Sequence, residues 1–448
     1  MIIRKEETAI RNWLSDHRHA LLITGARQIG KTYLIRHVLE SSQRPYVEFN
    51  FIRQPELVQL FNDASGVREL LTRISVASEQ KLIPGETVFF FDEVQECKEL
   101  VTWIKFLVEE GSFQYILSGS LLGIELSDIR STPVGYMKII DMYPVDLFEF
   151  FKALGIQDQT IAMIEEHFRN RSAIDEFVHE RLLRAYYLYL IIGGMPEAIQ
   201  TYLDTNDIVR VSEIHHSIIR QYKMDFAKYE QKNKLRLREI YDAIPGELEE
   251  KNKRFFINHL GDKTIYDRVK NDFLWLKDAG VALPVYNVTE PKAPLRISEK
   301  RNLFKLFLSD VGLLTSLYPN EVKMQILQRN ESINNGGLFE NAVVQELTAK
   351  GFPVYYFNSK RQGELDAIIE WEGRVLPIEV KSGKSYTRHS ALDNCIGDAN
   401  YEIEEAFVLC NGNIRQEGKV TYLPIYMAAC IKKEMQDKLI YKLDLGGI

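Results

Sequence analysis

The stretch Gly25-Ala-Arg-Gln-Ile-Gly-Lys-Thr32 fits the pattern G-x-x-x-x-G-K-[ST] at every fixed position. It directly follows a predicted strand and opens a predicted helix, which is the context that this pattern requires. In such a loop, backbone N–H groups surround phosphate oxygens, and the helix N-terminus adds positive potential. Lys31 would reach the outer phosphates and Thr32 would ligate Mg²⁺. We therefore predict a phosphate-binding loop, with a chance glycine-rich turn as the alternative; its residues are Gly25, Ala26, Arg27, Gln28, Ile29, Gly30, Lys31 and Thr32.

A second motif supports the first. The apolar run from Val88 to Phe91 is followed by Asp92 and Glu93. Asp92 would hold Mg²⁺ and Glu93 would orient an attacking water; a solvated strand end is the alternative. A third predicted strand ends at Ser118, which would sense the terminal phosphate or belong to an ordinary polar turn. The motifs together predict hydrolysis, with Lys31, Glu93 and Ser118 as catalytic groups.

The pattern around these motifs predicts an α/β fold. Between residues 20 and 150, short apolar runs alternate with longer mixed stretches, as in a parallel sheet with helices on both faces. We predict strands at Ala20–Thr24, Tyr46–Asn50, Thr87–Phe91, Tyr115–Leu117 and Met137–Ile140. The predicted phosphate-loop domain covers residues 1–150.

The remaining chain divides into three further predicted parts. In residues 151–235, apolar side chains recur every three or four positions, which predicts a helical lid that caps the sheet. In residues 236–325, a helix-like segment precedes two strand-like runs, Val281–Val288 and Leu303–Leu308, the order of a winged helix. A linker-like stretch at 331–337 leads into a third α/β unit at 332–448.

Composition and charge limit the class of protein. The chain has 448 residues, of which 45% are hydrophobic and 27% charged, as expected for a globular protein of several domains. The longest apolar stretches are about half of the roughly 20 residues that cross a bilayer. The charged N-terminus lacks a signal peptide, so we expect a cytoplasmic protein without membrane partners. Neither the four separated cysteines nor the adjacent His215 and His216 form a zinc motif. A net charge of −7 argues against a wholly basic nucleic-acid binder but allows a local basic patch.

Five motifs in this order resemble a known family. They are Gly25-Ala-Arg-Gln-Ile-Gly-Lys-Thr32, Phe91-Asp-Glu-Val-Gln95, Leu117-Ser-Gly-Ser120, Tyr143-Pro-Val-Asp-Leu-Phe-Glu-Phe150 and Gly193-Gly-Met-Pro-Glu197. The set resembles the prokaryotic AAA-type ATPases that carry a C-terminal domain of unknown function. The resemblance implies ATP and Mg²⁺ as cofactors and a homo-oligomer, such as a ring, whose sites take an arginine from the neighbouring subunit. We assign Arg130 to that role, with a solvated surface arginine as the alternative; Gly135-Tyr136 departs from the family pattern, in which many relatives have arginine.

Acidic residues and a lysine end two predicted strands near the C-terminus. Asp366 ends one strand-like run, and Glu379 and Lys381 end the next. Two carboxylates can share a hard divalent cation, and residues two apart on a strand face the same way. Glu340, on an upstream amphipathic helix, would supply a third acid. The set resembles the PD-(D/E)xK nuclease superfamily, including Holliday-junction resolvases, and implies a restriction-endonuclease-like fold. Metal-dependent DNA cleavage and a domain retained for DNA binding or scaffolding both stay open.

The predicted winged helix offers contacts to DNA phosphates or bases, near a concentration of basic residues at 223–254. The candidates are Lys263, Thr264, Arg268 and Lys270, with packing alone as the alternative; Phe273 and Trp275 fit a core. Our preferred hypothesis is an ATP-driven machine that remodels or branch-migrates duplex or branched DNA. The rival hypothesis, favoured by net acidity, is a nucleotide-gated switch that regulates a partner and does not act on DNA.

Overall fold

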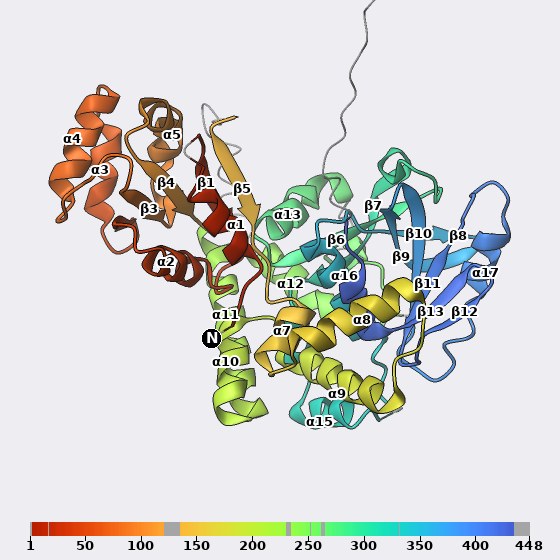
Figure 1. Ribbon diagram of the computed structural model, residues 1–448. Helices are drawn as coiled ribbons and strands as arrows, with labels where there is room; N and C mark the ends of the chain where they lie inside the picture. Colours follow the sequence, from red (N-terminus) through yellow and green to blue (C-terminus); the bar gives the residue numbers. More distant parts are fainter. Residues whose placement is uncertain are drawn as a thin grey trace, which may run out of the picture.

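The N-terminal part of the chain is built on a parallel sheet, drawn in red through orange to gold in Figure 1. The computed structural model describes residues 2–16, 18–120, 135–229, 234–250, 252–260, 265–330 and 332–433. The sheet has the order β2-β3-β4-β1-β5, and all its neighbouring strands are parallel. The strands are β1 (Ala20–Thr24), β2 (Tyr46–Asn50), β3 (Val88–Asp92), β4 (Gln114–Ser118) and β5 (Met137–Asp141). The α/β prediction is confirmed for this part, and β3 starts and ends one residue later than predicted.

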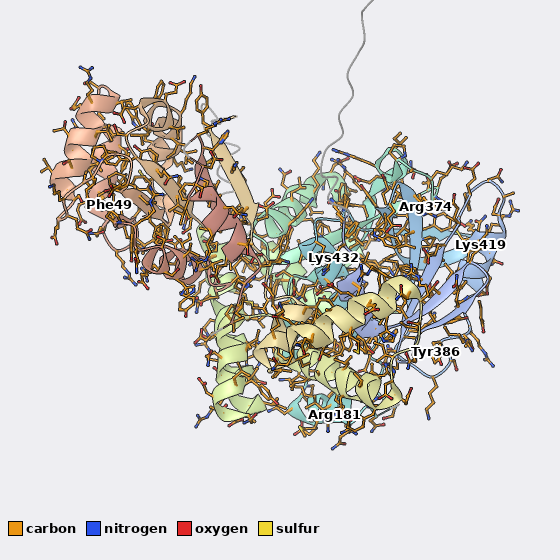
Figure 2. All side chains as sticks on the ribbon, in the orientation of Figure 1. Phe49, Arg181, Arg374, Tyr386, Lys419 and Lys432 are labelled. Atoms are coloured by element: carbon orange, nitrogen blue, oxygen red, sulfur yellow. The ribbon has the colours of Figure 1, made fainter. Side chains whose placement is uncertain are left out.

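Alternate residues of the strands enter two separate hydrophobic cores. The surrounding helices are α1 (Glu6–Trp13), α2 (Lys31–Ser41), η1 (Pro55–Leu57), α3 (Val58–Asn62), α4 (Val67–Ala77), η2 (Val94–Glu96) and α5 (Lys98–Glu110). Phe89 and Phe91 pack with Phe49, which is labelled in Figure 2, and with α3, α4 and α5. Phe90 packs on the opposite face with α1 and α2. Both faces are therefore buried, which explains why the strands are continuous apolar runs.

A helical segment connects this sheet to a second one. It comprises α7 (Leu147–Ala153), α8 (Asp158–Asn170), α9 (Glu176–Ile192), α10 (Pro196–Thr205), α11 (Ile208–Tyr229) and α12 (Lys234–Glu249). Helices α8 and α9 contact η6 (Ile425–Cys430) near the end of the described chain. Helix α11, in contrast, reaches the phosphate loop, where the Tyr222 hydroxyl donates to the Arg27 carbonyl at 3.1 Å. The predicted helices are present, but they bridge two sheets, whereas we expected them to cap the first.

Two glycines allow the turn between α9 and α10 to lie very close to Asp310 and Val145. Gly193 has a φ of 67°, and a Cβ atom there would lie 2.3 Å from Asp310 Oδ1. The Gly194 N–H donates to Asp310 Oδ2 at 2.5 Å, and its carbonyl accepts from Val145 N at 2.8 Å. The turn therefore joins the exit from the first sheet, at Val145, to the segment that begins at Asp310.

The second sheet has eight strands in the order β12-β13-β11-β10-β9-β8-β6-β7. They are β6 (Ala282–Val288), β7 (Glu299–Leu308), β8 (Tyr355–Ser359), β9 (Gly363–Trp371), β10 (Arg374–Val380), β11 (Ala406–Cys410), β12 (Arg415–Glu417) and β13 (Val420–Pro424). Its helices are η4 (Ile257–Leu260), α13 (Tyr266–Asp278), η5 (Leu295–Ser298), α14 (Val311–Ser316), α15 (Asn320–Leu327), α16 (Gly336–Ala349) and α17 (Ser390–Gly397). Helix α16 is buried from Gly337 to Leu347 and forms the centre of this part.

The hairpin of the predicted winged helix belongs to this second sheet. Strands β6 and β7 pair antiparallel as predicted, but β6 also pairs in parallel with β8, from Tyr286 opposite Tyr355 to Val288 opposite Phe357. The expected linker also differs, because Gly336 and Gly337 form the first turn of α16. The β6 edge of the hairpin is thus paired with another strand of the same chain. This arrangement differs from a free-standing winged helix. In the described residues, no helix has both the length and the hydropathy needed to cross a bilayer.

Candidate functional site

The phosphate loop wraps between β1 and α2, and its conformation depends on glycine. Gly25 has a φ of 134°, and a Cβ atom at this position would lie 2.1 Å from the Met142 carbonyl oxygen. Gly30 has a φ of 89° and caps the N-terminus of α2, where the nearest atom to an added Cβ is Pro196 Cγ at 3.6 Å. The loop therefore needs Gly25 for space and conformation, and Gly30 for conformation alone.

Lys31 is folded back over the loop. Its Nζ donates to the carbonyl oxygens of Gly25 at 2.8 Å and Ala26 at 2.7 Å, and the residue is 8% exposed. Burial lowers the pKa of Lys31 to about 8, while the nearby carboxylates of Glu93 and Asp92 oppose that shift. The ammonium group is thus held beside the loop where it would meet phosphate oxygens.

Asp92, at the end of β3, is the centre of a polar network. Its carboxylate accepts from Thr32 Oγ1 at 3.1 Å on both oxygens, from Asn50 Nδ2 at 2.9 Å, and from Ser118 Oγ. Burial raises the pKa of Asp92, and the bonds from Ser118 and Thr32 counteract it. Hydroxyl and carboxylate oxygens at this spacing suit Mg²⁺, which prefers oxygen ligands. Thr32 and Asp92 would therefore hold the ion that accompanies a nucleotide.

Glu93 faces the same cavity from the next position. It has a φ of 57°, and its Oε2 accepts from Gln95 Nε2 at 2.6 Å. The cavity has a volume of about 520 Å³, and its lining includes Lys31, Thr32, Asp92 and Glu93. Because β4 lies between β1 and β3, Ser118 reaches Asp92 from the adjacent strand. The sequence motifs that we predicted to act together are therefore brought together.

Arg27 and Gln28 connect the loop to α11. Arg27 Nε lies 3.0 Å from Asp225 Oδ2, and Gln28 Nε2 donates to Gln221 Oε1 at 3.1 Å. Asp225 is 5% exposed. Arg27 stands at a position that the loop pattern leaves unspecified, yet it forms an ion pair with the helical segment. The sequence alone did not identify Asp225 as its partner.

Arg4 connects the loop to the N-terminus and to α7. Its guanidinium donates to the Ile29 carbonyl at 3.0 Å, to the Tyr143 carbonyl at 2.7 Å and to Glu149 Oε1 at 3.2 Å. Glu149 forms a capping box with Asp146 at the start of α7. Burial, and then the nearby Asp146, raise the pKa of Glu149 to about 7.

A second cavity adjoins the phosphate loop near Arg4. It has a volume of about 320 Å³ and shares Gly30 and Tyr33 with the first cavity. Its lining includes the apolar residues Ile2, Ile29, Leu34 and Pro196. Pro196 belongs to the Gly-Gly-Met-Pro-Glu motif, so the structure brings two of the predicted motifs together here.

The acidic residues near the C-terminus also come together, but with two unpredicted lysines. Asp366 Oδ2 accepts from Val380 N at 2.9 Å, and Lys381 Nζ donates to Glu379 Oε1 at 2.6 Å. Glu340, on α16, forms ion pairs with Lys253 and with Lys305, the latter at 3.2 Å. Positive side chains therefore lie where the predicted metal would be bound.

The residues predicted to contact DNA are described only in part. Lys263, Thr264 and the proposed trans arginine, Arg130, lie outside the described residues. Arg268 and Lys270 are exposed on α13, and Lys270 Nζ lies 3.6 Å from Asp267 Oδ1. Phe273 and Trp275 are buried, as we expected of core residues.

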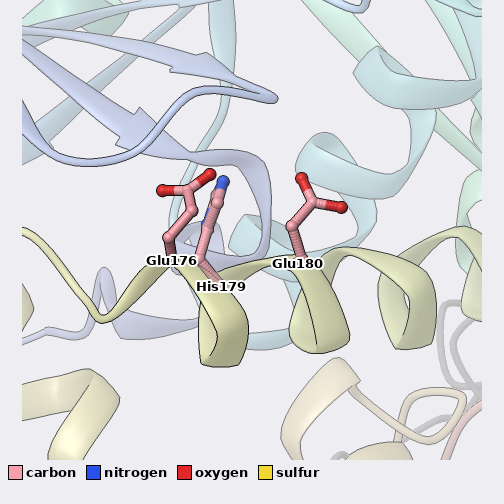
Figure 3. A group of neighbouring side chains, drawn as sticks. All are labelled: Glu176, His179 and Glu180. Carbon is pink, nitrogen blue, oxygen red and sulfur yellow. The ribbon is translucent and has the colours of Figure 1, made fainter.

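A group of potential metal ligands on α9, shown in Figure 3, already has other partners. Ligand atoms of Glu176, His179 and Glu180 lie within 4.8 Å of one another. However, the two ring nitrogens of His179 are 2.9 Å from the Tyr426 hydroxyl and 3.0 Å from the Asn411 carbonyl oxygen. Glu180 forms an ion pair with Arg329. These bonds join α9 to the C-terminal part and indicate a structural role.

Comparison with known families agrees with the geometry of the first site. Residues 17–151 match a family described as an AAA domain. Residues 183–324 and 335–427 match two families described as domains of unknown function, DUF8612 and DUF4143. The N-terminal part is thus a P-loop domain of the AAA type, and an appended C-terminal domain of unknown function is present as expected.

Comparison with solved structures gives only distant similarity, and no curated protein matches the chain. A Walker-type ATPase of Pyrococcus abyssi is 15% identical with a TM-score of 0.40, over 71% of this chain and 96% of that one. The ORC1 protein of Aeropyrum pernix, solved in complex with DNA, is 11% identical with a TM-score of 0.32, over 72% and 91%. The Pif1 helicase of Candida albicans is 12% identical with a TM-score of 0.24, over 40% and 47%.

Proposed function

We propose that this chain binds ATP with Mg²⁺ and hydrolyses it. The observation that carries the proposal is the convergence of Lys31, Thr32, Asp92 and Glu93 on one cavity. Lys31 would move from the loop carbonyls to the outer phosphates and offset their charge. Thr32 and Asp92 would hold Mg²⁺, which neutralises charge that develops on the phosphates. Glu93 would orient the attacking water.

The adjoining apolar cavity suits the base of the nucleotide. It begins at Gly30 and Tyr33, which also line the phosphate cavity, so one ligand can extend from one cavity into the other. Binding cavities for cofactors are mostly apolar with a few placed polar groups. Leu34 and Pro196 would provide apolar contact, and Glu197 and Gln200 offer polar atoms at the rim.

Two arginines connect the phosphate loop to the helical segment, so their contacts can depend on whether a nucleotide is bound. Arg27 ties the loop to Asp225 of α11, and Arg4 ties it to Glu149 of α7. A ligand that displaces the loop would move one or both pairs. We propose that these two arginines transmit the nucleotide state to the helical segment.

Two substitutions test the ATPase proposal. Lys31→Ala should weaken ATP binding, and Glu93→Gln should bind ATP but hydrolyse it at a small fraction of the normal rate. Glu96→Gln, an exposed acid three residues further on, is the matched control and should hydrolyse ATP normally. Equilibrium binding and steady-state phosphate release give the two readouts. Unchanged turnover in Glu93→Gln would contradict the role of that residue.

We propose DNA, duplex or branched, as the partner to test first. A groove of about 610 Å³ between α13 and the β6–β7 hairpin is lined by Lys270, Lys277, Arg296 and Arg301 as well as by Asp267 and Glu299. The excess of basic side chains favours a phosphate backbone, although Lys270 and Arg301 each have an acidic neighbour. The rival proposal remains a nucleotide-gated switch that does not act on DNA.

ATP hydrolysis at low salt separates the two proposals. The rate should be measured without DNA and with linear duplex, single strand and a four-way junction, with Glu93→Gln as the blank. Stimulation by one DNA form, reduced by the double change Lys277→Ala and Arg296→Ala, would support a DNA-coupled motor. If no DNA form changes the hydrolysis rate and none binds, the nucleotide-gated switch is favoured, since binding to phosphates is strongest at low salt.

The resemblance to AAA-type ATPases supports a further proposal, a homo-oligomer in which Arg130 completes the neighbour's site. Sedimentation velocity of Glu93→Gln with and without ATP tests it. A larger species should form with ATP, and Arg130→Ala should assemble but not hydrolyse. A monomer under both conditions would contradict this proposal and leave the ATPase proposal to its own test.

A further inference from the structure

Lys305 lies at the centre of the acidic cluster in the second sheet. Its Nζ is 2.9 Å from Glu364 Oε1, 3.2 Å from Glu340 Oε2 and 3.9 Å from Asp366 Oδ1. The side chain is 0% exposed, and Nζ also lies 5.3 Å from the centre of the Tyr356 ring. One lysine on β7 thus contacts acids of both α16 and β9.

The surrounding groups use most of the oxygens that a metal ion would need. Glu340 pairs with Lys305 through Oε2 and with Lys253 through Oε1. One oxygen of Asp366 accepts from the Val380 N–H, and Glu379 Oε1 accepts from Lys381. Glu379 Oε2 is buried without a hydrogen bond among the described residues, and Asp366 Oδ1 lies 3.9 Å from Lys305 Nζ, beyond hydrogen-bond distance. Mg²⁺ and Ca²⁺ in proteins take six or more oxygen ligands, often including water.

The charge of Lys305 is itself stabilised by the cluster. The carboxylates of Glu340 and Glu364 lie 3.2 Å and 2.9 Å from Lys305 Nζ, and opposite charges at these distances attract one another strongly in a buried site. A divalent cation at the same place would therefore have to displace a buried ammonium group that already pairs with these carboxylates. The residues present do not fit the metal that a nuclease-like site implies.

We propose that Lys305 takes the place of the divalent cation in this nuclease-like site. The cluster then binds no metal, and its ion pairs instead fix the β6–β7 hairpin to α16 and β9. This proposal goes beyond ATP hydrolysis and does not depend on it. It assigns the C-terminal domain a non-cleaving role, because metal-assisted hydrolysis needs an ion at these carboxylates.

Mn²⁺ binding to the full chain without nucleotide tests the proposal. All variants in this experiment carry Asp92→Asn, which removes the acidic ligand of the phosphate-loop site. The protein with this change alone is the parent, and it is compared with the parent that also carries Lys305→Met. Lys300→Met is the matched control, since Lys300 is exposed on the same strand. Free Mn²⁺ is followed by its electron paramagnetic resonance signal, and thermal unfolding with and without Mn²⁺ gives a second readout.

The parent and Lys300→Met should bind no Mn²⁺ at about 1 mM, the weak end of protein sites for hard cations. Lys305→Met should gain one site with a Kd of about 0.1 mM or lower, about tenfold below the concentration at which the parent binds none, and should lose that site again with Asp366→Asn. Mn²⁺ should raise the unfolding temperature of Lys305→Met alone, since a ligand that binds only the folded state stabilises it.

Two results would overturn the proposal. One is Mn²⁺ binding, or Mn²⁺-dependent cleavage of a four-way junction, by the parent that Asp366→Asn removes. The other is a folded Lys305→Met protein that gains no site, because the ammonium group would then not be what excludes the metal. If Lys305→Met does not fold, the parent alone decides: absence of binding supports the proposal, and binding that Asp366→Asn removes overturns it.

Discussion

Asn50 and Asp92 are joined by a 2.9 Å hydrogen bond from Asn50 Nδ2 to Asp92 Oδ2 at the ends of two neighbouring strands. The two residues are paired in the register of β2 and β3. Asn50 Oδ1 also accepts from the N–H groups of Ile52 and Arg53, which fixes the amide. A neutral amide therefore orients the carboxylate that would hold Mg²⁺.

We expect Asn50→Ala and Asn50→Ser to raise the Mg²⁺ concentration that ATP hydrolysis requires. Serine keeps a local bond to the following backbone but is too short to reach Asp92. A bond to a charged group contributes about 1.5–3 kcal/mol, so the rate at limiting Mg²⁺ should fall about tenfold or more in both variants. The measurement is phosphate release as a function of Mg²⁺. Normal Mg²⁺ dependence in Asn50→Ser would show that Asn50 acts only through the turn.

Gly25 and Gly30, the two glycines that the loop pattern requires, should differ in their tolerance of a methyl group. Gly25→Ala brings a Cβ to 2.1 Å from the Met142 carbonyl, whereas Gly30→Ala meets nothing closer than 3.6 Å. Each has a positive φ, which costs about 1–3 kcal/mol for alanine. We expect Gly30→Ala to fold with that loss and Gly25→Ala to lose considerably more, as measured by thermal unfolding. Equal unfolding temperatures would contradict the close approach of Met142.

The sequence predicts the first site well because its motifs are local. The phosphate loop, Asp92 and Glu93, and Ser118 each end a strand of the same parallel sheet, so pattern and spacing were enough to place them. Asn50 could have been found by the same reasoning, because it ends the predicted strand Tyr46–Asn50. Arg4 and Asp225 could not, since their partners lie far away in sequence and single charged residues carry no pattern.

The C-terminal part shows where sequence reasoning reaches its limit. The hairpin of residues 282–308 forms the two strands that we predict, yet its place at the edge of the second sheet depends on pairing with β8, which begins only at Tyr355. That pairing is what brings Lys305 to Glu340 and Asp366. An acid pattern on its own predicts a metal cation, and we propose that the ammonium group of Lys305 takes its place.

The buried pair between Arg4 and Glu149 gives a prediction on stability. Arg4 is 5% exposed and Glu149 is 6% exposed. Removing one partner of a buried ion pair leaves an uncompensated charge and costs about 3–5 kcal/mol. We expect Arg4→Met to lose this amount and the double variant Arg4→Met/Glu149→Gln to recover part of it. Glutamine removes the buried negative charge that Arg4 balanced, while its side-chain oxygen can still accept from Lys5 N or Asp146 N. Urea unfolding measures both, and a double variant less stable than Arg4→Met would contradict the pairing.

His215 should make the stability of the protein depend on pH. It is 1% exposed on α11, and its Nε2 lies 3.0 Å from the Ile192 carbonyl oxygen beside the Gly193 turn. Burial, together with the nearby Lys323 and His216, lowers the pKa of His215 to about 3, although the bond to Ile192 opposes this shift. The folded protein therefore keeps this imidazole neutral, whereas the unfolded chain protonates it near pH 6.5.

Because the folded protein keeps His215 neutral, its contribution to stability decreases as the pH falls. The stabilisation is present above pH 6.5 and is lost as the pH falls toward 3, by about 1.4 kcal/mol for each pH unit. Between pH 7 and pH 5, the wild type should thus lose about 2 kcal/mol of unfolding free energy that His215→Gln does not lose. Urea unfolding at the two pH values measures this, with His167→Gln, on α8, as the control. The same pH dependence in wild type and His215→Gln would mean that the imidazole is not kept neutral by the fold.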